Sequence, residues 1–193
     1  ASIATGLHYS QHGICANVAG TGTRGIASLD PCLPTYGHAF RRAGYRTPYV
    51  GKWHLSTPDD YASGGLERYG FEGWHGPDRE GHPLQGLRED ADVASEAIAW
   101  LGAHAADRPW FLTCSFVNPH DIMFFRRTEP PEDCPRYGVP LPVSFRDDLS
   151  TKPRIQARYQ AFWGQVMGMS PDQPEDLWRR YGAYLQRHFE PVA

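Results

Sequence analysis

The sequence has few cysteines, and their spacing excludes two common kinds of site. None of the four cysteines (Cys15, Cys32, Cys114 and Cys134) forms a C-x-x-C pair, so neither a zinc ribbon nor a thioredoxin-like motif is expected. We predict unpaired structural cysteines, with Cys114 buried inside an apolar run. A disulfide between Cys15 and Cys32 stays open at this point.

Long apolar runs and long basic runs are also missing. No apolar stretch approaches the roughly 18 residues that cross a bilayer, so no membrane span is predicted. The chain carries 19 basic and 22 acidic residues, with a formal net charge of −3. Basic residues occur at most as adjacent pairs, which argues against a nucleic-acid partner. The 193 residues, 40% hydrophobic and 13% aromatic, fit one globular domain or a large piece of one.

The first half of the sequence predicts a helix, a strand and a long loop. Residues 33–43 place apolar side chains at helical spacing, and Gly44 is suited to end that helix. The run Y-R-T-P-Y-V at 45–50 predicts a short strand. Residues 56–88 are rich in Gly, Pro, Asp and His, which predicts a long irregular loop.

The second half adds a strand and three helices. Residues 89–105 predict a helix that begins at Asp90 or Asp92 and has an apolar face that includes Ile98. The continuous apolar run at 110–117 is typical of a strand buried on both faces of a parallel sheet. A Pro-rich loop is expected at 129–148, followed by helices at 153–167 and 175–189. This order of elements predicts an α/β layered fold.

Three polar residues directly follow the two predicted strands. Lys52 and His54 come after the first strand, and His120 comes after the second. Ligands of parallel sheets bind outside the carboxyl ends of the strands, so the three side chains are candidates for one site. A lysine and two imidazoles suit an anionic group such as a sulfate or phosphate ester. Solvated turn and loop residues are the alternative interpretation.

Residues 44–54, G-Y-R-T-P-Y-V-G-K-W-H, resemble the second signature of the type I sulfatases, G-Y-x-T-x-x-x-G-K-W-H. Further segments resemble sulfatase segments in the family's order: ASIATGLHYSQHG, GFEGWHGPD, DVASEAIAWL, FLTCSFVNPHD and WRRYGAYL. The resemblance covers most of residues 1–125 and returns near 178–185. It implies the layered αβα sandwich of the alkaline phosphatase superfamily, with a mostly parallel sheet that is incomplete in this chain.

The resemblance also implies a mechanism. Sulfatases attack sulfate esters with a hydrated formylglycine, which a formylglycine-generating enzyme makes from the Cys or Ser of C-x-P-S-R, and a divalent cation, generally Ca²⁺, polarises the sulfate. By resemblance, Lys52 contacts the sulfate and the nucleophile, and His54 is a base beside the formylglycine hydroxyls. His120 contacts the ester oxygen and can protonate the leaving alcohol. The expected substrate is a small-molecule or carbohydrate sulfate ester.

The sequence departs from the family at the nucleophile and the metal. No Cys or Ser stands in a C-x-P-x-R context, and the family's paired metal-binding residues are missing. Residues 1–193 are therefore expected to be part of a single sulfatase catalytic domain, without its N-terminal nucleophile and metal segment and without its C-terminal part. No metal ligand is predicted in the chain. His8 and His12 stand four residues apart, a spacing that can bind a metal on one helix face, but their place in a family-like segment disfavours that interpretation. Asp121 is expected to stabilise a loop.

Two alternatives to a sulfuric ester hydrolase remain open. The same cation and imidazoles suit a phosphodiesterase or a phosphonate monoester hydrolase of the same superfamily. The chain by itself is alternatively a catalytically inactive truncated product, and we expect the isolated 193 residues to lack sulfatase activity.

Overall fold

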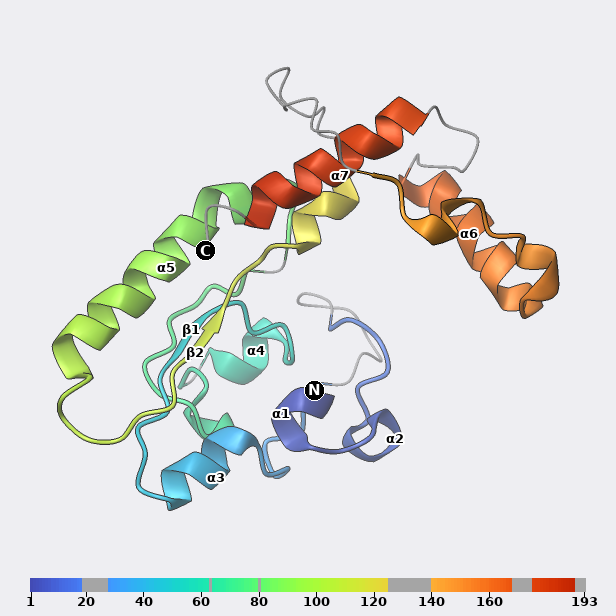
Figure 1. Cartoon of the computed structure of the whole chain (residues 1–193). Helices are drawn as coiled ribbons and strands as arrows, with labels where there is room; N and C mark the ends of the chain where they lie inside the picture. The colour runs from blue at the N-terminus through green and yellow to red at the C-terminus, as the bar shows by residue number, and fades with distance from the viewer. Residues whose placement is uncertain (19–27, 63, 80, 125–139, 168–174, 190–193) are drawn as a thin grey trace. The chain divides into compact units, whose positions relative to one another are not determined.

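The computed structural model describes residues 1–18, 28–62, 64–79, 81–124, 140–167 and 175–189 (Figure 1). The chain divides into two units. Unit 1 comprises Ala1–Glu80 and Arg88–Val117, and unit 2 comprises Gly81–Leu87 and Asn118–Ala193.

Two parallel strands form the sheet of unit 1. β1 (Tyr49–Gly51) pairs with β2 (Thr113–Ser115) in parallel, with Val50 opposite Cys114. Parallel strands need a long crossover, and here α5 (Gln85–His104) lies on the connection between them (Figure 1). The predicted α/β class with a parallel sheet is confirmed.

β1 is shorter than the predicted strand at 45–50. Pro48 has no amide hydrogen for a ladder, so regular pairing begins only after it. The residues on either side of Pro48 also form hydrogen bonds with Glu72: Glu72 N donates to Thr47 O at 2.9 Å, and Tyr49 N donates to Glu72 O at 3.1 Å. A segment predicted to be a loop therefore lies beside the strand.

The prediction that 110–117 is a strand buried on both faces is wrong. β2 has only three residues, and Cys114 at its centre is exposed rather than buried. Trp110 and Phe111 are exposed as well, whereas Val117 is buried. In the described part of the chain β1 is the only strand of the sheet beside β2, so much of the apolar run remains uncovered.

The hydrophobic core of unit 1 lies largely in the segment predicted to be an irregular loop. That segment contains α4 (Pro58–Tyr61) and the 3₁₀ helix η1 (Glu67–Tyr69). The core combines residues before, within and after β1: Leu29, Tyr49, Trp53, Leu66, Tyr69, Phe71 and Trp74. Four of its seven members come from 56–88, a contribution to the core that the composition of this segment did not indicate.

Three helices precede β1 among the described residues. They are α1 (Ser2–Thr5), α2 (Tyr9–His12) and α3 (Tyr36–Arg42). The Thr35 side chain accepts from the His38 amide and caps the start of α3. Gly44 has a φ of 87°, the left-handed conformation expected of a glycine that follows the end of a helix.

α5 (Gln85–His104) begins earlier than predicted. The Gln85 side chain accepts from the amides of Gly81 and His82, at 2.7 and 3.1 Å, and so holds the start of the helix. Asp90 is inside the helix and buried, and its carboxylate accepts from the amide of Val117 at 2.7 Å. The predicted start at Asp90 or Asp92 is therefore wrong. Of the predicted apolar face, Val93 and Ala97 are buried, whereas Ile98 is 68% exposed.

Unit 2 is mainly helical. It holds the 3₁₀ helices η2 (His120–Phe124), η3 (Val143–Arg146) and η4 (Leu149–Thr151), followed by α6 (Arg154–Met167) and α7 (Glu175–Phe189). The two closing helices confirm their predictions, since 3.6-residue periodicity carries a clear signal over 14 or 15 residues. Most of the predicted loop at 129–148 lies outside the described residues.

None of the helices in the described ranges is both long enough and apolar enough to cross a bilayer. The sequence led to the same expectation.

Candidate active site

The reactive turn, residues 51–54, leaves the carboxyl end of β1. Lys52 N donates to Ser115 O at 2.8 Å, which continues the parallel ladder one residue beyond the strand. Gly51 has a φ of 96°, and a Cβ there would lie 2.0 Å from Ser115 O, so no other residue fits. The first residue of the turn thus lets the chain leave the sheet, and half-buried Lys52 follows at once.

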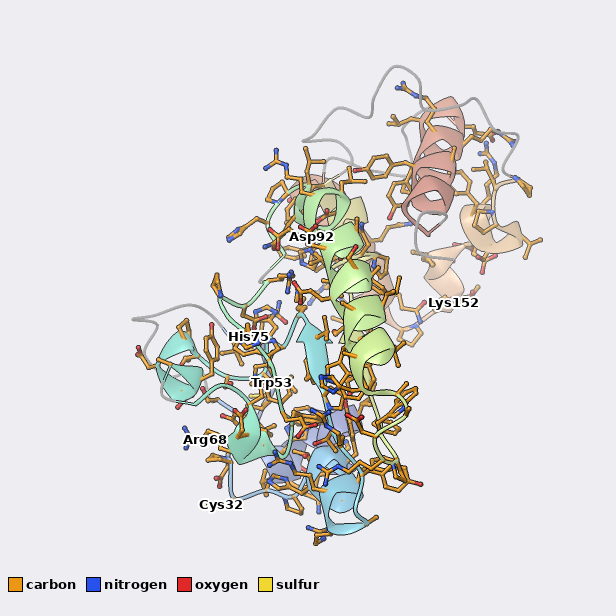
Figure 2. The ribbon with its side chains drawn as sticks, turned by 90° about the vertical axis from the view of Figure 1, so that its left-hand side faces the viewer. Cys32, Trp53, Arg68, His75, Asp92 and Lys152 are labelled. Atoms are coloured by element: carbon orange, nitrogen blue, oxygen red, sulfur yellow. The ribbon has the colours of Figure 1, made fainter. Side chains whose placement is uncertain are left out.

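Two core aromatics hold the carbonyls of the reactive turn. The Tyr49 hydroxyl donates to Lys52 O at 2.7 Å, and Trp74 Nε1 donates to Gly51 O at 2.8 Å. Burial raises the pKa of the Tyr49 phenol, so this hydroxyl keeps its proton and stays a donor. Trp53, labelled in Figure 2, is buried, packs edge-to-face against Tyr49, and donates through Nε1 to Ser56 Oγ at 2.6 Å.

Asp78 holds the amides of the reactive turn. Its Oδ1 accepts from Trp53 N at 2.8 Å, and its Oδ2 accepts from His54 N at 2.5 Å. Hydrogen bonds to a charged acceptor are shorter and stronger than those between neutral groups. One carboxylate therefore fixes two successive peptide units of the turn.

His54 has an unusual backbone and a directed imidazole. Its φ is 51°, a left-handed conformation that is uncommon for a residue with a Cβ. Its Nε2 lies 2.7 Å from Val18 O. A carbonyl only accepts, so Nε2 carries the hydrogen and Nδ1 is the nitrogen that can accept a proton.

His120 belongs to unit 2 and opens η2. Its imidazole is 31% exposed, and its Nδ1 lies 4.0 Å from Oδ1 of fully buried Asp121. The other oxygen of Asp121 accepts from Gly86 N at 2.7 Å, as expected of a carboxylate that stabilises a loop. The structure thus brings Lys52 and His54 together on one turn of unit 1, while their convergence with His120 stays a prediction.

A family model described as Sulfatase matches residues 1–187 of the chain. The chain belongs to the sulfatase family. This match confirms the resemblance first seen at residues 44–54.

Two curated sulfatases align with most of this chain. An uncharacterized sulfatase of Escherichia coli (strain K12), YidJ, is 28% identical over 184 residues, which covers 80% of this chain and 35% of the relative. A choline-sulfatase of Rhizobium meliloti (strain 1021) is 29% identical over 180 residues, which covers 70% of this chain and 34% of the relative. The chain spans about a third of the length of these relatives.

A solved structure of a Bacteroides thetaiotaomicron protein, described under the metabolism of multiple glycosaminoglycans, also aligns with the chain. The alignment covers 98% of this chain and 44% of that one, at 19% identity and a TM-score of 0.47.

The sequence did not identify two partners of the reactive turn. Asp78 was seen only as the last letter of a family-like segment, and Val18 contributes a carbonyl, which any residue has. The available signal was an acidic residue after Gly-Pro in an aromatic segment, a type of residue that often binds nearby amides.

No metal centre is found in the part of the sulfatase chain that the structure describes. Within it, no group of three or more His, Cys, Asp or Glu side chains is placed to hold an ion. His12 is buried, accepts from Ile14 N through Nδ1, and meets Ser2 Oγ through Nε2 at 2.9 Å. His8 Nδ1 meets Ser10 Oγ at 3.1 Å. Both imidazoles thus serve local structure.

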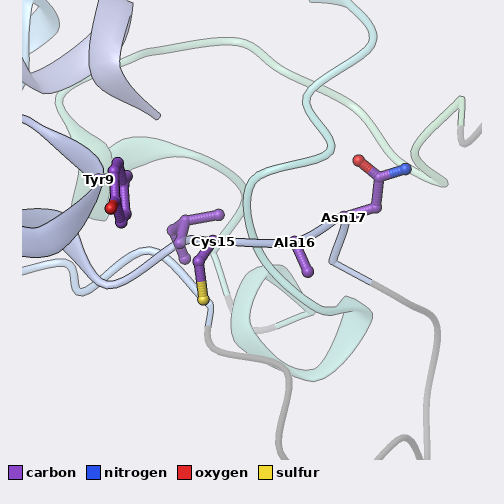
Figure 3. Close-up of a pocket in the computed structure, with 5 residues that line it drawn as sticks. Tyr9, Cys15, Ala16 and Asn17 are labelled. Carbon is purple, nitrogen blue, oxygen red and sulfur yellow. The ribbon is translucent and has the colours of Figure 1, made fainter. Parts of the chain in front are cut away.

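An open pocket of about 440 Å³ lies near the amino end of the chain (Figure 3). It is lined by Tyr9, Ile14, Cys15, Ala16 and Asn17, and not by the reactive turn. Cys15, Cys32 and Cys114 are all free thiols, so the Cys15–Cys32 disulfide is absent, while Cys134 lies outside the described residues.

Proposed function

We propose that the complete enzyme that contains these residues hydrolyses sulfate esters. One observation carries the proposal: a chain of the sulfatase family presents Lys52 and His54 on a turn held by Tyr49, Trp74 and Asp78. Held in this way, reactive side chains need little reorganisation when substrate binds. The expected substrate is a small-molecule or carbohydrate sulfate ester.

Lys52 supplies the positive charge of the proposed site. Its compact ammonium group would contact a sulfate oxygen and the nucleophile. Lys52 is half-buried, and salt screens a partly buried charge less than an exposed one. Its contribution should therefore be to binding the sulfate and to balancing negative charge in the transition state.

The two histidines supply proton transfer in the proposal. His54 keeps a hydrogen on Nε2 for the Val18 carbonyl and would take a proton at Nδ1 during the release of sulfate. His120 would give a proton to the oxygen of the leaving alcohol. This role requires that His120 of unit 2 and His54 of unit 1 act on the same sulfate.

The described residues do not fit the family's metal by themselves, because they contain no group of three potential ligands. No step is therefore derived through a cation. We propose that the Ca²⁺ ligands and the formylglycine belong to the rest of the complete enzyme, where a formylglycine-generating enzyme would modify the nucleophile.

An assay of the complete enzyme on paired substrates tests the proposal. We expect kcat/KM for an aryl sulfate to exceed that for the matching aryl phosphodiester, and the isolated 193 residues to turn over neither. A preference for the phosphodiester or a phosphonate monoester by orders of magnitude would favour the related hydrolases instead. Ca²⁺-dependent turnover by the isolated chain would contradict the proposal that nucleophile and metal lie elsewhere.

A further inference from the structure

We propose that Asp78 is a positioning residue for His54, acting through the backbone of the reactive turn. The inference deepens the proposed function and rests on it, because it assigns to Asp78 the task of aiming an imidazole that works on a sulfate ester. In the described part of the chain, the Asp78 carboxylate accepts from two backbone amides of the turn, Trp53 N and His54 N, which lie 25 and 24 residues earlier.

The geometry of the carboxylate is the first support. Each oxygen takes a different amide, Trp53 N at 2.8 Å and His54 N at 2.5 Å. A carboxylate has two equivalent acceptors and no donor, so it can satisfy two amides that point the same way. A neutral side chain such as Asn offers one acceptor and would set its NH₂ group against the second amide.

The backbone of His54 is the second support. A φ of 51° is unfavourable for a residue with a Cβ and persists only where surrounding contacts hold it. The His54 amide is held by Asp78, and the preceding carbonyls of the turn are held by Tyr49 and Trp74. Asp78 is the partner that acts on the strained residue itself.

The imidazole gives the consequence for chemistry. Nε2 lies 2.7 Å from Val18 O in a residue whose backbone is left-handed, and we infer that the contact depends on this conformation. This contact selects the tautomer with hydrogen on Nε2 and leaves Nδ1 as the proton acceptor. If the turn relaxed, the ring would lose the carbonyl and the two tautomers would mix.

The test uses the complete enzyme, labelled with ¹⁵N-histidine, and the variant Asp78→Asn. In the unaltered enzyme the nitrogen shifts of His54, identified by their loss in His54→Gln, should report hydrogen on Nε2. In Asp78→Asn we expect tautomer mixing and a kcat lowered about 10- to 100-fold, the usual range for a residue that orients another. KM should change little, because Lys52 keeps its own bond to Ser115 O.

Asp148→Asn is the matched control. Asp148 likewise accepts from a backbone amide, Ser150 N at 2.8 Å, but in an exposed turn of unit 2. This variant should keep both the His54 signals and kcat. A kcat for Asp78→Asn equal to that of the control would overturn the proposal, even if the melting temperature fell, since a merely structural carboxylate behaves in that way.

The nitrogen shifts separate this inference from the proposed function. They can be read whether or not the enzyme accepts a sulfate ester. If the unaltered enzyme carries hydrogen on Nδ1 of His54, the positioning role is wrong while sulfatase activity can still stand. If the tautomer is as expected and changes in Asp78→Asn, the positioning role holds even where the substrate assignment fails.

Discussion

Tyr49 joins the hydrophobic core to the reactive turn. Its ring contacts Trp53 and Phe71 with centroid separations of 5.6 and 5.2 Å, and its hydroxyl donates to Lys52 O. Burial raises the pKa of this phenol above its ordinary value of 10.0. A single residue therefore couples packing to the position of the candidate cation.

Replacing Tyr49 by Phe should lower the free energy of unfolding by about 1 kcal/mol, because Lys52 O loses a buried donor. The variant should also respond less to alkali. Above pH 10 the Tyr49 phenol loses its proton in the unfolded chain before it does so in the folded protein. The free energy of unfolding of the unaltered protein therefore falls as pH rises from 10 towards the pKa of Tyr49 in the folded protein. Urea unfolding followed by tryptophan fluorescence at pH 8 and pH 11 measures both effects.

Tyr159→Phe serves as the control for this substitution. Tyr159 is exposed on α6, so removing its hydroxyl should leave unfolding at pH 8 unchanged. Equal free energies of unfolding for the two variants at pH 8 would contradict the role given to Tyr49. So would a fall in the free energy of unfolding between pH 8 and pH 11 that is the same in Tyr49→Phe as in the unaltered protein.

At the residue scale, the sequence was sufficient to place Lys52 and His54 on one turn after a strand. Two positions apart, after Gly51, they had to share that turn whatever the rest of the fold. It was not sufficient for Asp78, because a contact with amides 24 and 25 residues earlier depends on how the segment between them folds. The convergence of His120 with this turn remains a prediction.

At the scale of elements, the pair β1–β2 is the frame of the candidate site. At its last register pair, Gly51 with Ser115, a Cβ on Gly51 would lie 2.0 Å from Ser115 O. The reactive turn begins at this point, so the separation of the strands determines where Lys52 starts.

Gly51→Ala should separate these strands. The added methyl group meets Ser115 O at 2.0 Å and the φ of 96° is unfavourable as well, so a loss of more than about 3 kcal/mol is expected. Gly44→Ala isolates the conformational part of this loss, because Gly44 has a φ of 87° with nothing within 4 Å of a new Cβ. That variant should lose about 1 to 2 kcal/mol from conformation alone. Comparable losses in thermal unfolding of the two variants would contradict the close approach.

The elements predicted correctly were those with a local signal. The helices α6 and α7 follow from periodicity within their own residues. The segment 56–88 was predicted to be a long loop, and most of it up to the start of α5 is irregular, but its composition did not indicate that some of its apolar residues, among them Leu66 and Phe71, are fully buried. The long apolar run at 110–117 gave a β-strand of three residues, since strand length depends on partners along the whole run.

At the scale of the whole molecule, the chain is a sulfatase-family segment that spans about a third of its curated relatives. It forms two units, with Lys52 and His54 in the first and His120 in the second. The family could be recognised from residues 44–54 because reactive side chains and strand exit coincide in one short stretch. The sulfated substrate could not, since it depends on surfaces that no short motif encodes.

The most direct test of the sulfate site is kcat/KM of Lys52→Ala for an aryl sulfate in the complete enzyme. Lys152→Ala is the control, because Lys152, labelled in Figure 2, is an exposed lysine 3.9 Å from Asp147. If Lys52 faces the sulfate, its removal should lower kcat/KM about 100-fold or more, a loss of at least about 2.7 kcal/mol in transition-state stabilisation. The control should stay unchanged. Equal activities of the two variants would contradict the account.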